Sequence, residues 1–111
     1  MQLHERFEWD DTKERSNIEK HGLGFDAAAR VLADPAGDFH HYEEPDEAHG
    51  AGEDRYRTVA TYPEDRGLVL TIVWTERQDD EGLLTRIISA RLASRKERKK
   101  YAEYIQQKHG A

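Results

Sequence analysis

The sequence predicts a single α+β domain, residues 1–111, in which two N-terminal helices precede a mainly antiparallel sheet of three to four strands and a C-terminal helix. Three observations support this fold class. Helix start and stop signals lie in the first third of the chain, three runs rich in β-branched and aromatic residues follow, and a capping motif begins the last, basic segment. The length is that of one ordinary domain.

The N-terminal part is expected to form a short strand at 7–9 and then a helix. Asp10 or Asp11 can cap the start of that helix, and Gly22 can end it by adopting a left-handed backbone conformation. Few positions of this helix are apolar. Four polar side chains follow the i, i+4, i+7, i+8 spacing of one helical face: Lys13, Asn17, Lys20 and His21.

A second helix is predicted over 26–34, where apolar side chains recur at helical spacing and Pro35 prevents continuation. Residues 36–54 show no period, are acidic and contain three histidines, so we interpret them as a loop. Imidazole and carboxylate groups can hold zinc, but their spacing here matches no metal-binding motif. We therefore expect no metal site and no cofactor.

Three strands are predicted after this loop, at 55–62, 68–75 and 84–91. The middle run is apolar on both alternating faces, which is typical of an interior strand. Polar turns at 63–67 and 78–82 separate the runs. Because such short turns permit only hairpins, we expect the three strands to be antiparallel neighbours.

The last helix is predicted to begin at Ser94 and to run to about Lys108. Ser94 and Glu97 stand three residues apart and match the capping box, in which each side chain binds the backbone N–H of the other residue. Five of the six residues 95–100 are cationic, an arrangement that opposes the helix dipole. On charge alone, this cluster is either a surface for phosphates or an acidic partner, or a plain solvated face.

The net charge of −6 conceals a strong asymmetry. Residues 86–108 carry eight Lys or Arg against two Glu, a charge of +6, so the rest of the chain carries −12. Period two places Arg86 and Arg91 on opposite faces of their strand. Both guanidinium groups can hold phosphate oxygens with paired donors, or they can pair with the many carboxylates of this protein.

Several function classes are excluded by the sequence. The absence of cysteine removes disulfides and thiolate metal sites. No apolar run approaches the roughly 18 residues of a membrane span, and no export signal is present, so we expect a cytoplasmic protein without a membrane partner. Ser-His-Asp, Walker and dinucleotide-binding patterns are missing. His21 could act as an acid or a base, or it could simply cap its helix.

Short motifs occur in a characteristic order between residues 7 and 101. They are Phe7-Glu-Trp-Asp10, Lys20-His-Gly22, Thr75-Glu-Arg77 and Arg86-Ile-Ile-Ser-Ala-Arg91, followed by Glu97-Arg98 and Tyr101. In this combination the chain resembles the BrnT family of toxins from type II toxin–antitoxin pairs. It departs from the family pattern at Ala60, where relatives usually have glycine, at Trp74, usually tyrosine, and at Leu92, usually basic.

The resemblance implies a RelE-like fold and a ribonuclease toxin that arrests translation. It also implies neutralisation by a BrnA-like ribbon-helix-helix antitoxin, so that operator DNA would be contacted only through the antitoxin. The catalytic candidates are Arg86, Arg91, His21, Glu97 and Tyr101. The candidates for binding RNA phosphates are Lys20, Arg55, Arg77, Arg95 and Arg98. An alternative from a different class is a catalytically weak module that mainly seats the antitoxin and supports promoter autorepression.

RNA cleavage without a metal ion needs a base for the 2′-hydroxyl proton, an acid for the leaving 5′-oxygen and cations around the phosphorane. At the matched positions, His21 or Glu97 could be the base. Lys20 or Tyr101 could be the acid or could orient the substrate. The arginines are the stronger candidates, because guanidinium groups stay charged at any working pH.

Overall fold

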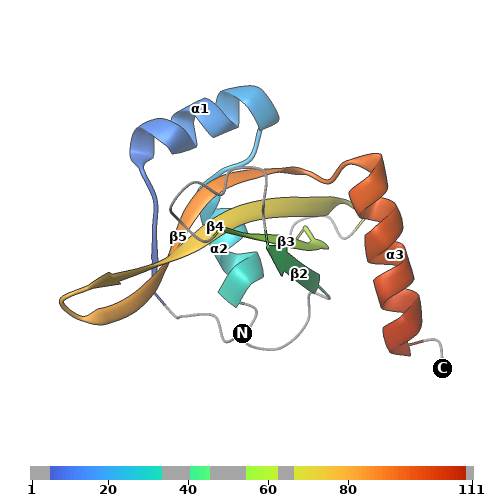
Figure 1. The fold of residues 1–111 in the computed structure, drawn as a ribbon. Helices are drawn as coiled ribbons and strands as arrows, with labels where there is room; N and C mark the ends of the chain where they lie inside the picture. The colour runs from blue at the N-terminus through green and yellow to red at the C-terminus, as the bar shows by residue number, and fades with distance from the viewer. Residues whose placement is uncertain (1–5, 34–40, 46–54, 63–66, 110–111) are drawn as a thin grey trace.

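The computed structural model describes residues 6–33, 41–45, 55–62 and 67–109, and it confirms the α+β fold class. The elements in chain order are β1 (Phe7–Glu8), α1 (Asp11–His21), α2 (Phe25–Ala33), β2 (His41–Pro45), β3 (Arg55–Thr61), β4 (Val69–Asp79), β5 (Gly82–Leu92) and α3 (Arg95–His109). Figure 1 shows the twisted sheet at the centre of the molecule, with α1 beside β5 and α3 at the opposite end. Within the described residues, no helix has both the length and the hydrophobicity required to cross a bilayer.

The sheet has five strands in the order β1-β5-β4-β3-β2. β1 runs parallel to β5, and all other neighbours are antiparallel. The prediction of a loop over 36–54 is therefore wrong at 41–45, where the chain pairs with β3 as an edge strand. The segment is polar and shows no clear alternation, since an edge strand has only one neighbour and little area to bury. The rest of that predicted loop, with His40 and His49, lies outside the described residues.

The β4–β5 hairpin is longer than predicted. Its strands continue to Asp79 and begin again at Gly82, although the positions between 76 and 81 are exposed. Exposed polar residues can pair through their backbones although they show no hydrophobic pattern. The sequence pattern therefore predicted a turn at 78–82 where the strands in fact continue. The helix α2 begins at Phe25, one residue before the predicted start.

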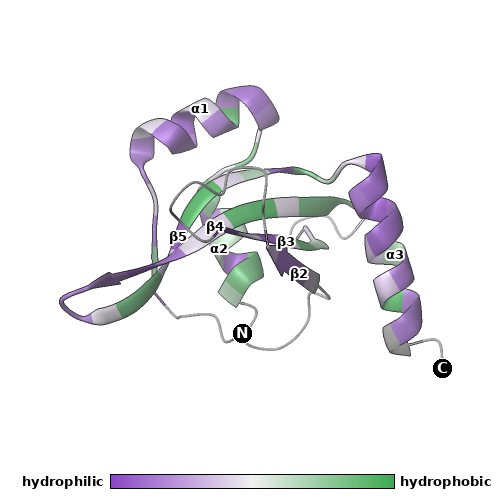
Figure 2. Ribbon diagram, in the orientation of Figure 1, coloured by the Kyte–Doolittle hydropathy of each residue, from purple (hydrophilic) through white to green (hydrophobic). Residues whose placement is uncertain are grey.

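The main hydrophobic core lies between α2 and one face of the sheet. Its buried members from α2 are Phe25, Ala28, Val31 and Leu32, and those from the strands are Ala60, Leu70, Ile72, Trp74, Ile87 and Ala90. Figure 2 shows the hydrophobic residues concentrated along the central strands and α2, whereas α1 and α3 are largely hydrophilic. The main core thus covers one face of the sheet, and α1 and α3 lie outside it.

Trp74 is the largest fully buried side chain of this core. Its indole N–H donates to the Thr58 hydroxyl at 2.8 Å, and its ring centroid lies 4.7 Å from that of Tyr56. A buried tryptophan needs such a partner for its N–H. The residue that departs from the family pattern therefore fits its position in the core.

A second, smaller cluster holds α3 against the other face of the sheet. Val59, Ala93 and Tyr101 are buried there, and Tyr42 and Ile105 pack against them. The apolar side chains of this otherwise hydrophilic helix therefore dock on the sheet. The hydroxyl groups of Tyr101 and Thr61 are hydrogen bonded at 2.5 Å, so the polar end of the tyrosine is satisfied.

The helix α1 is attached to the sheet through Asn17, which is buried although the sequence placed it with the exposed polar side chains of this helix. Its side-chain N–H groups donate to the carbonyls of Leu23 and Ala90 at 2.9 and 2.7 Å, and its carbonyl accepts from the Ala90 N–H at 3.2 Å. The Asn17 amide thus bonds to backbone groups of β5 at the edge of the sheet, beyond the two residues that pair with β1. Helical periodicity alone does not reveal this, because the partner is 73 residues away.

Replacing Asn17 with alanine should lower the free energy of unfolding by about 2–3 kcal/mol, because it leaves buried backbone groups of Leu23 and Ala90 without partners. Thermal and urea unfolding would measure the change. Ser16→Ala, at an exposed neighbouring position, is the matched control and should stay within about 0.5 kcal/mol of the parent. Equal stability of the two variants would contradict this role of Asn17.

Candidate functional site

A β-bulge in β5 decides how the arginines of this strand are oriented. Trp74 pairs with Ile87 and Val73 pairs with Ser89, so Ile88 is an extra residue without a partner. One extra residue reverses the alternation of side chains beyond it. Arg86 and Arg91 therefore lie on the same face of the sheet, and the prediction of opposite faces is wrong.

This face of the sheet carries two rows of polar side chains, set by the strand register. The first row, across β1, β5, β4 and β3, is Glu8, Arg86, Thr75 and Arg55. The second row, across β5, β4, β3 and β2, is Ser89, Val73, Arg57 and Glu44. Directly opposite residues share one face and lie about 5 Å apart. Three arginines from two strands thus lie over the small residues of β4.

Arg91 extends from the end of β5 toward α3, where it meets Glu97. Its two terminal nitrogens donate to the two carboxylate oxygens of Glu97 at 2.7 and 3.0 Å. This paired geometry fixes both the position and the plane of the guanidinium group. About one third of the Arg91 side chain is exposed, so the group is held and still accessible.

Glu97 is buried at the start of α3 and accepts from several further donors. The Thr71 hydroxyl and the Ser94 backbone N–H donate to the same oxygen at 2.9 and 2.8 Å. The Glu97 N–H in turn donates to the Ser94 hydroxyl at 3.2 Å, which confirms the predicted capping box. One carboxylate therefore closes the helix cap and orients Arg91.

The protonation state of Glu97 follows from these contacts. Burial raises its pKa, but the hydrogen bonds from Arg91, the Ser94 N–H and Thr71 outweigh burial and lower the pKa to about 2. A general base works best with a pKa near the operating pH. With both oxygens engaged and the pKa this low, Glu97 is better suited to hold cations than to accept a proton.

A second carboxylate, Glu44 on β2, joins two more cations to this group. It forms ion pairs with Arg57 and Lys100, and the Arg57 Nε lies 3.8 Å from Glu97. The hydrogen bond from Lys100, and with it that from Arg57, lowers the pKa of Glu44 against the effect of burial. Arg91, Glu97, Arg57, Glu44 and Lys100 therefore form a chain of alternating charge across β5, α3, β3 and β2.

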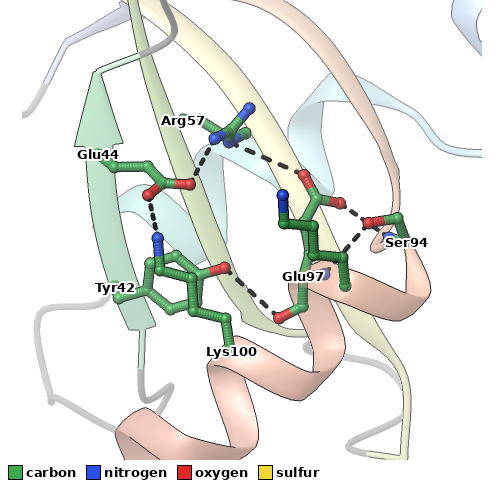
Figure 3. A pocket seen from close by; sticks show the side chains of 7 residues that line it. Tyr42, Glu44, Arg57, Ser94, Glu97 and Lys100 are labelled. Carbon is green, nitrogen blue, oxygen red and sulfur yellow. Dashed lines mark hydrogen bonds and ion pairs between the residues drawn. The ribbon is translucent and has the colours of Figure 1, made fainter.

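A cavity of about 250 Å³ opens where β2, β3 and the first turns of α3 meet. Figure 3 shows Arg57, Glu44 and Lys100 pointing toward one another beside it, with Glu97 and Ser94 on the helix side. Its lining residues are Tyr42, Glu44, Arg57, Ser94, Lys96, Glu97 and Lys100. All of these residues are charged or bear a hydroxyl group, so the cavity is suited to a polar, anionic group.

Four of the residues predicted from the sequence lie on or at this face. Arg55 and Arg86 flank Thr75, and the Arg86 guanidinium also pairs with Glu8. Arg91 and Glu97 form the paired contact described above. Arg77 is exposed farther along β4, where it pairs with Leu84 in the hairpin.

The other predicted residues are placed elsewhere. Lys20 and His21 are exposed at the end of α1, beside the β5 edge, and in the described part of the structure neither contacts the arginines. Arg95 and Arg98 are exposed on α3. Tyr101 is buried in the cluster under α3, which makes its hydroxyl group part of the packing.

Sequence reasoning missed Arg57, Glu44 and Lys100 as parts of the site. Arg57 lies two residues after Arg55 in the same strand. Because side chains two residues apart share a face of the sheet, Arg57 could have been predicted as part of the site. Glu44 lay in a segment interpreted as a loop, and Lys100 was one of several cations in a helical run. Only the pairing of β2 with β3 brings them together.

The arrangement provides a fixed array of guanidinium groups on a rigid sheet, with carboxylates that hold them in place. Such groups bind phosphate oxygens through paired donors and stabilise negative charge that develops at phosphorus. Among the described residues, no three His, Asp or Glu side chains are grouped as a metal ion would require. The array of guanidinium groups suits a phosphate-bearing ligand.

A comparison with protein families agrees with this chemistry. The model of the family described as "Ribonuclease toxin, BrnT, of type II toxin-antitoxin system" matches residues 9–97. The chain belongs to the BrnT family. No curated protein sequence shows significant similarity to it. The matched range covers α1 through the start of α3 and includes every residue of the two arginine rows except Glu8.

Membership of the BrnT family indicates RNA as the substrate class. A ribonuclease toxin of a type II pair acts on RNA and has a cognate antitoxin. The arginine face is the described surface whose chemistry best suits an RNA backbone, since backbone binding by proteins depends mainly on Lys and Arg at the phosphates.

Proposed function

We propose that this BrnT-family protein is an endoribonuclease that cuts RNA without a metal ion and thereby arrests translation. We further propose that a BrnA-like ribbon-helix-helix antitoxin neutralises it and carries the contacts to operator DNA. The observation that supports the catalytic proposal most directly is the bulge at Ile88, which brings Arg86 and Arg91 to the face already occupied by Arg55 and Arg57.

In the proposed reaction, the 2′-hydroxyl group gives its proton to water and its oxygen attacks the adjacent phosphorus, and the 5′-oxygen leaves with a proton taken from water, so that a cyclic phosphate is formed. The phosphorane carries additional negative charge. Arg91 and Arg86 are the proposed donors to its oxygens, with Arg55 at the neighbouring backbone. Fixed cations of this kind stabilise the transition state more than the ground state, because charge develops where they already point.

Glu97 is the proposed positioning residue of this site. Its carboxylate holds the plane of Arg91 by two hydrogen bonds and also lies near the Arg57 Nε. The low pKa keeps it ionised throughout the neutral range. A substrate phosphate that approaches Arg91 would therefore meet a preorganised guanidinium group, which needs little reorganisation during the reaction.

Incubating the purified, antitoxin-free protein with RNA in excess EDTA tests this function. We expect fragments that end in a 2′,3′-cyclic phosphate, at a rate that added Mg²⁺ does not raise. Loss of cleavage in EDTA and recovery with a divalent ion would contradict the metal-free mechanism. Heat-denatured protein and an RNA with 2′-O-methyl groups are the controls, since both should give no product.

The alternative function, a catalytically weak module that seats the antitoxin, is favoured by one observation. The Arg57, Arg86 and Arg91 side chains each already have a carboxylate partner, so the free surface is less cationic than the arginines alone suggest. Intact RNA at high protein concentration, together with tight antitoxin binding, would favour this alternative.

A further inference from the structure

The cavity beside α3 contains cations that the proposed reaction does not use. Lys100 and Lys96 reach it from the first two turns of α3, and Arg57 reaches it from β3. The two lysines come from α3 and the arginine from β3, and Figure 3 shows Lys100 and Arg57 on either side of Glu44. Converging like charges repel one another, so an anion between them stabilises the arrangement.

In the free protein that anion is Glu44. Its two carboxylate oxygens bind Arg57 on one side and Lys100 on the other. About a quarter of the Glu44 side chain is exposed, and more than half of Lys100 is exposed. The Lys100 side of this arrangement is solvent-exposed, where ion pairs add little to stability, so an entering anion can compete with the Glu44 carboxylate for the lysine.

We propose that this cavity is a second phosphate subsite, which binds the RNA phosphate next to the one that is cleaved, and that Glu44 occupies it until RNA binds. This inference rests on the proposed function, since it assigns a place to the neighbouring nucleotide of the same substrate. Arg57 links the two subsites, because it pairs with Glu44 in the cavity and lies 3.8 Å from the Glu97 carboxylate that holds Arg91.

The surroundings favour a nucleic-acid backbone over a protein partner. The cavity continues directly into the arginine face through Arg57, so one RNA strand could follow both. The face of the Tyr42 ring is already covered, with the Lys100 ammonium 5.5 Å from its centroid. A protein anchor usually inserts an aromatic or aliphatic side chain into an apolar pocket, and the lining here is mostly charged.

The test measures binding of a short 2′-O-methyl RNA, which cannot be cleaved, by fluorescence anisotropy. Lys100→Ala and Lys96→Ala should each raise Kd about fivefold and reduce the slope of log K against log salt by nearly one unit. Lys99→Ala is the matched control: it removes the same charge from the same helix at an exposed position that does not line the cavity. Its Kd should change by less than about twofold.

A substitution of Glu44 provides a second, independent test, because it should change Kd in the opposite direction to the lysine substitutions. Glu44→Gln removes the competing anion and should lower Kd about threefold or more, although it breaks two ion pairs of the folded protein. Glu43→Gln makes the same change on the same strand, but Glu43 pairs with Thr58 on the opposite face and should leave Kd unchanged. Thermal unfolding of all variants confirms that they are folded.

The outcomes separate this inference from the proposed function. Equal effects of Lys99→Ala and Lys100→Ala, or weaker RNA binding by Glu44→Gln, would overturn the subsite even in a protein that cleaves RNA. Unchanged RNA binding with weakened antitoxin binding would also overturn it and assign the cavity to the protein partner. A protein that binds RNA with the expected pattern but does not cut it would support the subsite and contradict the proposed reaction.

Discussion

Replacing Arg91 with alanine should lower the rate of RNA cleavage by about 10²–10³-fold, which is the usual loss when one preorganised donor to a developing oxyanion is removed. The Arg91 guanidinium group is held by paired hydrogen bonds to Glu97 at 2.7 and 3.0 Å. Single-turnover cleavage at saturating protein measures the effect, because it separates the chemical step from RNA binding.

The alanine variant also leaves the buried carboxylate of Glu97 without its main partner. Such a loss costs up to about 3–5 kcal/mol of folding free energy, so reduced activity alone would be ambiguous. Arg91→Lys retains the charge beside Glu97 but not the planar, paired donors. It should remain folded and still lose at least about tenfold in rate.

The control for these variants is Arg15→Ala, which removes an arginine from the exposed surface of α1. It should cleave RNA at the parental rate. Folded Arg91→Ala and Arg91→Lys proteins with parental rates would contradict the assignment of Arg91 to the phosphorane. A loss that is equal in all three variants would instead indicate a general effect of net charge on RNA binding.

Glu97→Gln should remove most of the decrease in the free energy of unfolding that protonation of this site causes at low pH. The folded-state pKa of Glu97 is about 2, below its ordinary value of 4.5. The stabilisation from its ionised form is therefore fully present above about pH 4.5 and is lost as the pH falls toward 2. A difference of this size corresponds to at most roughly 3 kcal/mol.

Urea unfolding between pH 2 and 7 would measure this prediction. In the parent protein, the free energy of unfolding should fall steeply below pH 4.5, whereas Glu97→Gln should start lower at pH 7 and show a flatter acid limb. Glu103→Gln removes the same charge from an exposed position of the same helix and separates the local effect from that of net charge. Parallel acid limbs for parent and Glu97→Gln would show that the carboxylate is not held as described.

Local signals in the sequence were sufficient for the parts of the fold that depend on nearby residues. The caps at Asp10, Gly22 and Ser94 all form as predicted, because each joins groups only a few residues apart. The three central strands were also predicted, since hydrophobic runs and polar turns determine them. Their ends were not, because paired backbone in the β4–β5 hairpin continues beyond the hydrophobic residues.

The arrangement of the site depended on contacts that are distant in the sequence. Period two failed for Arg86 and Arg91 because the bulge at Ile88 arises from pairing with β4, and nothing in the run Ile87-Ile-Ser89 marks one residue as extra. Glu44 and Lys100 could not be connected for a similar reason. They are 56 residues apart, and an edge strand with no hydrophobic pattern brings one of them to the other.

The resemblance to the BrnT family identified the residue types of the site better than their roles. It drew attention to Arg86, Arg91 and Glu97, which the structure places on or at one face. It did not distinguish them from His21, which is exposed beside the β5 edge, or from Tyr101, which is packed under α3. Order along the chain carries no information about which side chains meet.

The bulge at Ile88 also has a consequence for how this protein can vary over evolution. A substitution at this position changes one half-buried side chain and leaves the orientation of Arg91 intact. Deletion of Ile88 would remove the bulge but leave the two arginines four positions apart, on the same face of a regular strand, whereas regular pairing without a deletion would place them on opposite faces. The spacing of the two arginines therefore has to match the presence or absence of the bulge, and an inactive relative could retain every functional side chain in a β5 that pairs with β4 without it.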